Sequence, residues 1–244
     1  MTSWIIGDVH GCADELSELI ERLALGPEDR VYSCGDLFHR GPDPAGVMDL
    51  LKDSGAQWVL GNHERTVLQR VGLAPRRPDA SDRPALRTEF PPIDESDLAG
   101  DGGSSCRVPA ERRADFLRFL QTHAGYTLAS TDLPAAGPTA DGRPWRIVHA
   151  GIDPRGLAES SIDCLTGIRR LSGRGKPWWY EAYEGPELVL FGHTHSKLPR
   201  AWRAGGRLLA LGLDTGCVFG GSLSAYSPEL DELVSVSAFS RNAR

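Results

Sequence analysis

Six of the seven histidines in this chain lie in short clusters that also contain aspartate, asparagine or glycine. The clusters read Gly7-Asp8-Val9-His10-Gly11, Gly35-Asp36-Leu37-Phe38-His39-Arg40-Gly41, Gly61-Asn62-His63-Glu64, His149-Ala150-Gly151 and Gly192-His193-Thr194-His195. Carboxylates, imidazoles and amide oxygens are suitable ligands for Mn, Fe or Zn, and these clusters hold no thiolate. One cluster of this kind would be a weak signal, but five of them predict a site for divalent metal ions.

Each cluster follows a short apolar run, and such runs predict buried β-strands. The predicted strands are 4–6, 30–34, 58–60, 146–148, 188–191 and 208–213. Amphipathic patterns between them predict helices at 14–25, 44–54 and 64–72. This alternation is typical of β-α-β units, in which ligands bind at the carboxyl ends of the strands. The five clusters are therefore expected to meet at one site.

Two parts of the chain depart from this pattern. Closely spaced strands follow the last of the runs and favour antiparallel sheet; they are predicted at 223–226 and 232–238. Residues 74–103 are rich in Pro, Asp, Arg, Ser and Gly, and a helix is predicted after them at 111–123. We predict a single domain over residues 1–244 with an insertion at about 74–144, which either caps the metal site or is a solvated excursion.

The composition is that of an ordinary globular protein, with 40% hydrophobic and 25% charged residues. A formal net charge of −6 argues against stable nucleic-acid binding, which requires a basic face. It allows a phosphate substrate, because metal ions can supply positive charge locally. No apolar run approaches the ~18 residues of a membrane span, and the five cysteines are too widely spaced for a disulfide or zinc framework. We expect a cytoplasmic protein that does not bind membranes.

In this order the clusters resemble the calcineurin-like metallophosphoesterase superfamily, whose motifs are GDxHG, GDxxDRG, GNHE, a later histidine before small residues, and GHxH. The second cluster with its arginine and the complete third cluster are similar to the phosphoprotein-phosphatase-like branch, which includes bacterial serine/threonine phosphatases and symmetrical diadenosine tetraphosphatases. The resemblance extends from residue 6 to about 215, with no motif in 74–144. It implies an αββα sandwich of two mixed β-sheets flanked by helices.

The resemblance also implies a pair of divalent ions, with Mn²⁺ preferred and Fe or Zn as alternatives. The two implied ligand sets share one residue; they are Asp8, His10, Asp36 and His195 for one ion, and Asp36, Asn62, His149 and His193 for the other. Asp36 would bridge the ions, which lie ~3.5–4 Å apart in such sites. His195 has no counterpart in much of the phosphatase branch.

Catalytic roles follow from the same resemblance. A hydroxide that bridges the ions would attack phosphorus, and His63 would protonate the leaving oxygen. Arg40 and Arg169 would bind phosphate oxygens beside Asn62, and Arg170 is an alternative to Arg169.

His39 is the one departure from the family pattern, because relatives carry the aspartate of Asp-Arg-Gly at this position. That aspartate is expected to hydrogen-bond the catalytic histidine and to raise its pKa. An imidazole has no such effect, and a charged imidazole has the opposite one. We therefore expect His63 to lose its proton at a lower pH in this protein than in those relatives.

The implied activity is hydrolysis of phosphate monoesters or phosphoanhydrides, acting on a phosphorylated small molecule, a dinucleoside polyphosphate or a phosphoprotein. The alternatives are a phosphodiesterase or nuclease of the same superfamily and a catalytically silent binding scaffold. Residues 173–180 contain Trp178, Trp179 and Tyr180, which either stack on a substrate ring or pack in the core. Residues 214–217 resemble the block that follows GHxH in bacterial relatives and are expected to support the metal loops.

Overall fold

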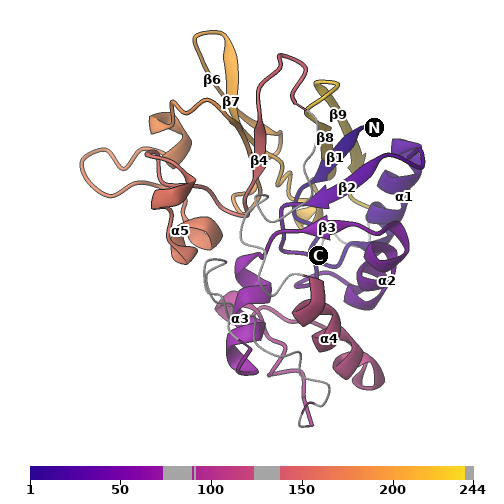
Figure 1. Cartoon of the computed structure of the whole chain (residues 1–244). Helices are drawn as coiled ribbons and strands as arrows, with labels where there is room; N and C mark the ends of the chain where they lie inside the picture. Colours follow the sequence, from indigo (N-terminus) through magenta and orange to yellow (C-terminus); the bar gives the residue numbers. More distant parts are fainter. Residues whose placement is uncertain (74–89, 91, 124–137, 240–244) are drawn as a thin grey trace.

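Two β-sheets form the centre of the computed structural model (Figure 1), which describes residues 1–73, 90, 92–123 and 138–239. The five-stranded sheet has the order β3-β2-β1-β8-β9, and the four-stranded sheet has the order β4-β5-β7-β6. The strands of the first sheet are β1 (Ser3–Ile6), β2 (Arg30–Ser33), β3 (Gln57–Trp58), β8 (Ser222–Ser227) and β9 (Glu232–Ser237). The strands of the second sheet are β4 (Trp145–Ile147), β5 (Leu188–Phe191), β6 (Arg200–Ala204) and β7 (Arg207–Gly212).

Both sheets are mixed. In the first sheet, β1, β2 and β3 are parallel. β8 pairs antiparallel with β1, and β9 pairs antiparallel with β8. In the second, β4, β5 and β7 are parallel, and β6 pairs antiparallel with β7. The strands that precede the five clusters are therefore parallel to one another within each sheet, and their carboxyl ends share one edge of it.

Alternate residues of the central strands face different layers. Ile5 and Tyr32 of the first sheet pack in one core with Ile147 and Leu190 of the second, so this core fills the space between the sheets. The neighbouring Ile6 belongs to the core that includes the apolar faces of the helices. Since side chains alternate across a strand, each sheet has one face on the other sheet and one on helices. The prediction of an αββα sandwich with two mixed sheets is confirmed.

The helices are α1 (Ala13–Leu23), α2 (Pro44–Ser54), α3 (Asn62–Arg70), α4 (Arg113–His123) and α5 (Ile162–Gly167). In Figure 1, α1 and α2 lie on the outer side of the first sheet, and α5 lies beside the second. α1 buries Leu16, Leu19 and Leu23, which recur with the period of a helix. α2 begins where the Asp43 side chain accepts a hydrogen bond from the backbone N–H of Gly46.

Several boundaries differ from the predicted ones. β3 ends at Trp58, and α3 begins at Asn62, so the asparagine and histidine of the third cluster lie in the first turn of a helix. β6 and α5 were not predicted, because β6 is a half-exposed edge strand and α5 has only six residues. Of the predicted insertion, residues 74–89, 91 and 124–137 lie outside the described residues. None of the described helices is long and apolar enough to cross a membrane.

Candidate active site

The loops after the parallel strands bring the five clusters together. Asp8 follows β1 and Asp36 follows β2. Asn62 is the first residue of α3, which is the next element after β3. His149 follows β4 and His193 follows β5 of the other sheet. The two groups meet, since His149 Nε2 and His193 Nδ1 lie 2.9 and 3.0 Å from Asn62 Oδ1. The candidate site therefore lies where the carboxyl edges of the two sheets join.

The Asp36 carboxylate occupies the centre of this cluster. Its Oδ2 is 3.5 Å from the Nε2 of His149, 3.8 Å from that of His63 and 3.9 Å from that of His10. Two groups of possible metal ligands share this carboxylate, one with His10 and His63 and the other with His149 and His193. A carboxylate common to two ligand groups is the arrangement expected of a bridge between two ions. The distances allow His63 Nε2 either to coordinate an ion or, when protonated, to donate a proton.

The hydrogen bonds of His149 show that a cation fits this site. Burial lowers the pKa of His149 to about 4, so the ring is neutral, and its Nδ1 donates to the Cys34 carbonyl oxygen at 2.8 Å. Nε2 then carries a lone pair that faces two further acceptors, Asn62 Oδ1 at 2.9 Å and Asp36 Oδ2 at 3.5 Å. Three converging acceptors without a donor repel one another when buried, whereas a divalent cation among them would be coordinated.

Asp8 and His10 form the other side of the cluster. The Asp8 carboxylate accepts hydrogen bonds from the backbone N–H of His193 at 3.0 and 3.1 Å and lies 3.9 Å from His10 Nε2. Arg40 Nη1 donates to the same His10 nitrogen at 2.7 Å. Because Nε2 has one lone pair, His10 can either accept from Arg40 or coordinate an ion through this atom. Binding of an ion by His10 Nε2 would therefore release the Arg40 guanidinium.

The carboxyl groups of the site lack sufficient positive charge from the protein itself. Burial raises the pKa of Asp8 well above its usual value, and the charges of Asp214 and Asp36 raise it further. Burial and the charge of Glu64 likewise raise the pKa of Asp36. Two divalent cations would reverse this situation, because they are the strongest local charges that such a site can hold. The donor set and its electrostatics therefore both fit a pair of divalent ions.

Backbone strain is concentrated in the same loops. His10, Asp36, Arg40 and His193 have φ values of 50°, 53°, 74° and 63°, in the left-handed region that residues with a side chain seldom adopt. Strained backbone of this kind is found where a functional geometry is imposed by the surrounding structure. The surrounding fold thus stabilises an unfavourable backbone conformation at these four residues, and this conformation sets the direction of their side chains.

His195 and the two arginines occupy different places relative to the cluster. His195 is exposed, packs 5.0 Å from the ring of Phe219 and lies outside both groups of possible ligands, so its role as a ligand stays a prediction. Arg169 Nη2 lies 3.4 Å from the carbonyl oxygen of His193, whereas the Arg170 guanidinium lies 4.0 Å from the centre of the Trp178 ring. Arg169 is thus the arginine that borders the site.

Known proteins are similar in sequence to this chain over most of its length. The family model for calcineurin-like phosphoesterases matches residues 1–197. The chain belongs to this family. It is 30% identical to the symmetrical bis(5′-nucleosyl)-tetraphosphatase of Serratia proteamaculans, over 92% of this chain and 90% of the relative. It is 28% identical to the asymmetrical bis(5′-nucleosyl)-tetraphosphatase of Bacillus velezensis, over 95% of this chain and 91% of the relative. The protein is accordingly a metal-dependent phosphoesterase.

Solved structures agree with the family assignment. The crystal structure of a candidate diadenosine tetraphosphatase has a TM-score of 0.68 at 27% identity, covering 98% of this chain and 94% of that one. A serine/threonine phosphatase from Saccharomyces cerevisiae has a TM-score of 0.54 at 14% identity, covering 98% of this chain and 79% of that one. The latter likeness is one of fold.

The family's Asp-Arg-Gly aspartate is replaced here by His39, which stacks on His63 with ring centres 4.9 Å apart. His39 Nε2 lies 3.1 Å from the Leu98 carbonyl oxygen, and its Nδ1 lies 3.6 Å from Glu64 Oε1. Both nitrogens of the His39 ring therefore face acceptor oxygens. Burial first, and then the charges of His39 and Arg40, lower the pKa of His63 to about 3. The expected difference in this pKa from relatives that carry the aspartate stays a prediction.

Glu64 lies within the third cluster, but no role was predicted for it from the sequence. Its Oε2 accepts from the backbone N–H of Asp36 and its Oε1 from that of Leu37, each at 3.0 Å. Burial alone would raise its pKa, but the nearby imidazoles of His39, His63 and His149 outweigh burial, and the pKa falls to about 2. The ionised Glu64 therefore fixes the backbone that carries the Asp36 carboxylate.

A segment of the insertion, Leu98 to Ser105, covers one side of the site. Asp101 Oδ2 accepts a hydrogen bond from Asn62 Nδ2 at 3.0 Å, which orients the amide so that Oδ1 faces the histidines. Gly100 packs on the stacked imidazoles, where a Cβ atom would collide with His63 Nδ1 and His39 Cδ2. The segment has no recognisable motif, so the sequence offered no signal for either contact.

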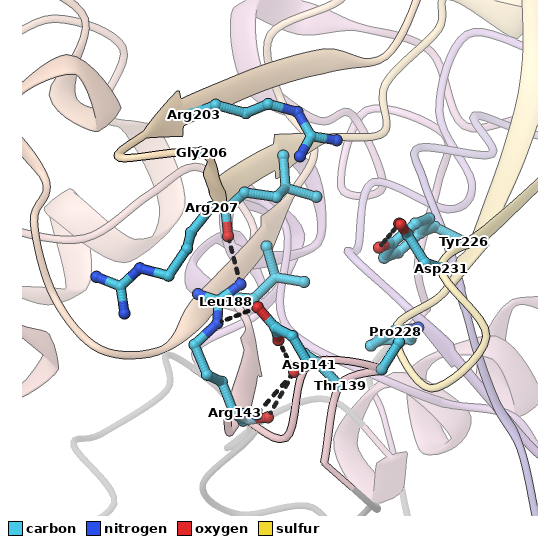
Figure 2. Close-up of a pocket in the computed structure, with 12 residues that line it drawn as sticks. Thr139, Asp141, Arg143, Leu188, Arg203, Gly206, Arg207, Tyr226, Pro228 and Asp231 are labelled. Carbon is cyan, nitrogen blue, oxygen red and sulfur yellow. Dashed lines mark hydrogen bonds and ion pairs between the residues drawn. The ribbon is translucent and has the colours of Figure 1, made fainter.

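A second hollow lies at the opposite edge of the second sheet (Figure 2), beside Leu188 at the amino end of β5. Its lining includes Arg143, Arg203 and Arg207, with Arg143 paired to Asp141. The lining contains no histidine, so this hollow lacks the ligand chemistry of the cluster described above.

Replacing Asp36 by asparagine should remove both metal sites together. Because burial raises the pKa of Asp36, the neutral amide relieves an electrostatic cost, and the melting temperature of the metal-free protein should stay equal or rise. The amide loses the charge that two ions would share, so Mn²⁺ measured by elemental analysis should fall from about two ions to below about one per chain. Asp53→Asn on the exposed face of α2 is the control and should keep both ions. Two tightly bound ions in Asp36→Asn would refute the bridge.

Gly100→Ala should damage turnover without unfolding the protein. The added methyl group must displace the His39–His63 stack, and a displacement of ~1 Å at a catalytic group can lower turnover about 100-fold. Gly26→Ala is the matched control, since its Cβ would meet only the Asp29 side chain at 3.4 Å. The comparison requires kcat with p-nitrophenyl phosphate and a thermal melt. Equal turnover by Gly100→Ala and the wild type would show that this segment does not fix His63.

Proposed function

We propose that this phosphoesterase hydrolyses the phosphoanhydride bridge of dinucleoside polyphosphates with two divalent ions, Mn²⁺ in preference to Mg²⁺. The observation that supports it best is the convergence of acceptor atoms from Asp36, Asn62 and His149 without a donor among them. The tetraphosphatases named above are similar to the chain over nine-tenths or more of its length, which favours the same substrate class.

The chain's own residues fit a pair of ions as follows. The proposed ligands are Asp8, His10, Asp36 and His195 for one ion, and Asp36, Asn62, His149 and His193 for the other. When bound, the ions would acidify water and stabilise charge on the phosphoryl group. We prefer Mn²⁺ because the several imidazoles suit it better than Mg²⁺, which favours an octahedral set of oxygens.

Other residues would handle the substrate. Arg40 and Arg169 border the cluster from two sides, so they can bind phosphate oxygens with their planar guanidinium groups, next to the amide of Asn62. His63 faces the cluster through Nε2 and is the candidate proton donor to the leaving oxygen. The Leu98–Ser105 segment would exclude water from this side, which makes the described part of the insertion a cap within a single domain over residues 1–244.

The Mn²⁺-loaded protein should hydrolyse diadenosine tetraphosphate with a kcat/KM at least about tenfold above that for a phosphoserine peptide or a cyclic nucleotide. Chelation should abolish turnover, and Mn²⁺ should restore more of it than Mg²⁺. Product analysis distinguishes the cleavage modes of the two relatives. Symmetrical cleavage of diadenosine tetraphosphate gives two diphosphates, and asymmetrical cleavage gives a triphosphate and a monophosphate. A preference for the phosphopeptide would replace this proposal with a protein phosphatase, and full activity without metal would refute the metal mechanism.

His39→Gln should move the alkaline limb of the kcat profile upward for an alkyl phosphate. The substitution removes the electrostatic interaction with His39 that lowers this pKa, so the pKa of His63 should rise from about 3, and the protonated form should persist to higher pH. The effect should shrink with p-nitrophenyl phosphate, whose leaving group hardly needs a proton. Glutamine is preferred to the aspartate of relatives, which would stand beside Glu64. Identical pH profiles for the wild type and His39→Gln on the alkyl phosphate would show that His39 does not influence the pKa of His63.

A further inference from the structure

An exposed aromatic ring borders the candidate active site. The Phe219 side chain is 56% exposed, and the Arg40 guanidinium carbon lies 5.6 Å from the centre of its ring. The His195 ring lies against it, with ring centres 5.0 Å apart at 43°. Arg40 also donates to His10 Nε2, so one guanidinium group separates Phe219 from a candidate metal ligand. The ring thus stands beside the place where substrate phosphate is expected.

The backbone holds Phe219 in this position. The short 3₁₀ turn Cys217–Phe219 lies between Gly216 and Gly220, whose φ values of 72° and 84° suit glycine. The backbone N–H of Phe219 donates to the Gly216 carbonyl oxygen at 2.9 Å, and that of Gly220 donates to Cys217 at 3.0 Å. Cys217 is buried and anchors the turn. The phenyl ring is therefore presented to solvent by an ordered turn with defined hydrogen bonds.

The aromatic residues that the sequence offered for stacking are already covered. Trp179 and Tyr180 are buried in the core. The Trp178 ring contacts the guanidinium groups of Arg170 and Arg200, at 4.0 and 4.5 Å, and stacks on Tyr180. Phe219 differs from these three residues, because it combines exposure with contact to a phosphate-binding candidate. Exposed apolar surface beside a site of this kind indicates a ligand that covers it.

We propose that Phe219 is a platform on which the base of a nucleoside phosphate stacks while Arg40 binds the neighbouring phosphate. The ligand class is a nucleoside di- or polyphosphate, which carries an anion and a flat ring in one molecule. A phosphoserine peptide has no ring next to its phosphate. Every base has a π-face, so this platform should accept purines and pyrimidines alike. The identity of the natural substrate rests on the proposed function, but the stacking contact itself can be tested without catalysis.

The test compares two ligands that resist hydrolysis and differ by the nucleoside. The affinities of adenosine 5′-(α,β-methylene)diphosphate and methylenediphosphonate are measured by calorimetry on the Mn²⁺-loaded wild type, Phe219→Ala, Phe219→Trp and Phe219→Leu. Phe219→Ala should raise the Kd of the nucleotide about tenfold, which is within the range for loss of base stacking on an aromatic ring. The Kd of the bisphosphonate should change by less than about twofold, and tryptophan should restore nucleotide binding where leucine does not.

Leu230→Ala serves as the matched control, because Leu230 is 53% exposed and belongs to the turn between β8 and β9. An equal loss of affinity for both ligands in Phe219→Ala would overturn the proposal, because it would show that Phe219 only positions Arg40. Unchanged nucleotide affinity would overturn it as well. Turnover of diadenosine tetraphosphate by the wild type separates the two proposals. A protein that binds the nucleotide through Phe219 but leaves the tetraphosphate intact contradicts only the proposed function.

Discussion

Burial of the Asp36 carboxylate is the constraint from which the rest of the site follows. An ion removed from water loses several kcal/mol unless nearby charges and hydrogen bonds replace the solvent. Here Asp36 is 2% exposed, and burial together with the charge of Glu64 raises its pKa more than the charges of His39 and Arg40 lower it. Glu64 holds the surrounding backbone rigid, so the carboxylate cannot turn away to water. Divalent ions would compensate the charge, and the stability of the loaded protein should therefore depend on metal concentration.

The same constraint ties the site to the packing of the two sheets. Asp8, Asp36 and Asn62 come from one sheet, and His149 and His193 come from the other. The hydrogen bond from His149 to the Cys34 carbonyl oxygen crosses this junction and sets the tautomer of the ring. The core between the sheets must therefore keep its spacing, because a shift of ~1 Å would separate the two halves of a ligand set. The packing between the two sheets thus controls the geometry of the candidate metal ligands.

Features that depend on a local pattern of residues could be predicted from the sequence. Contacts that depend on the tertiary fold could not. Apolar runs followed by polar clusters predicted the strands and the residues at their ends, since a strand's burial and its carboxyl terminus are properties of a few consecutive residues. The contacts of Asp101 and Leu98 arise within a segment whose composition indicates only an insertion, and they depend on how it folds back over α3. Phe219 was missed for a related reason. Its exposure follows from a glycine-bounded turn, whereas the aromatic-rich 173–180 segment that attracted the prediction is covered by the core and by arginines.

His39 stands where the family motif has the aspartate of Asp-Arg-Gly, and it contacts His63, the proposed proton donor. An aspartate at this position would place an anion beside that histidine and favour its protonated form. Here the charges of His39 and Arg40 add to the effect of burial, and the pKa of His63 falls to about 3. A histidine that gives up its proton so readily is seldom protonated near neutral pH, so it serves poorly a leaving alkoxide that must be protonated. A nucleotide leaving from a phosphoanhydride departs as a stabilised anion and needs that proton far less. Under the proposed function, the low pKa of His63 would suit anhydride cleavage better than hydrolysis of serine phosphates. The proposed base platform, Phe219, borders the same site through Arg40.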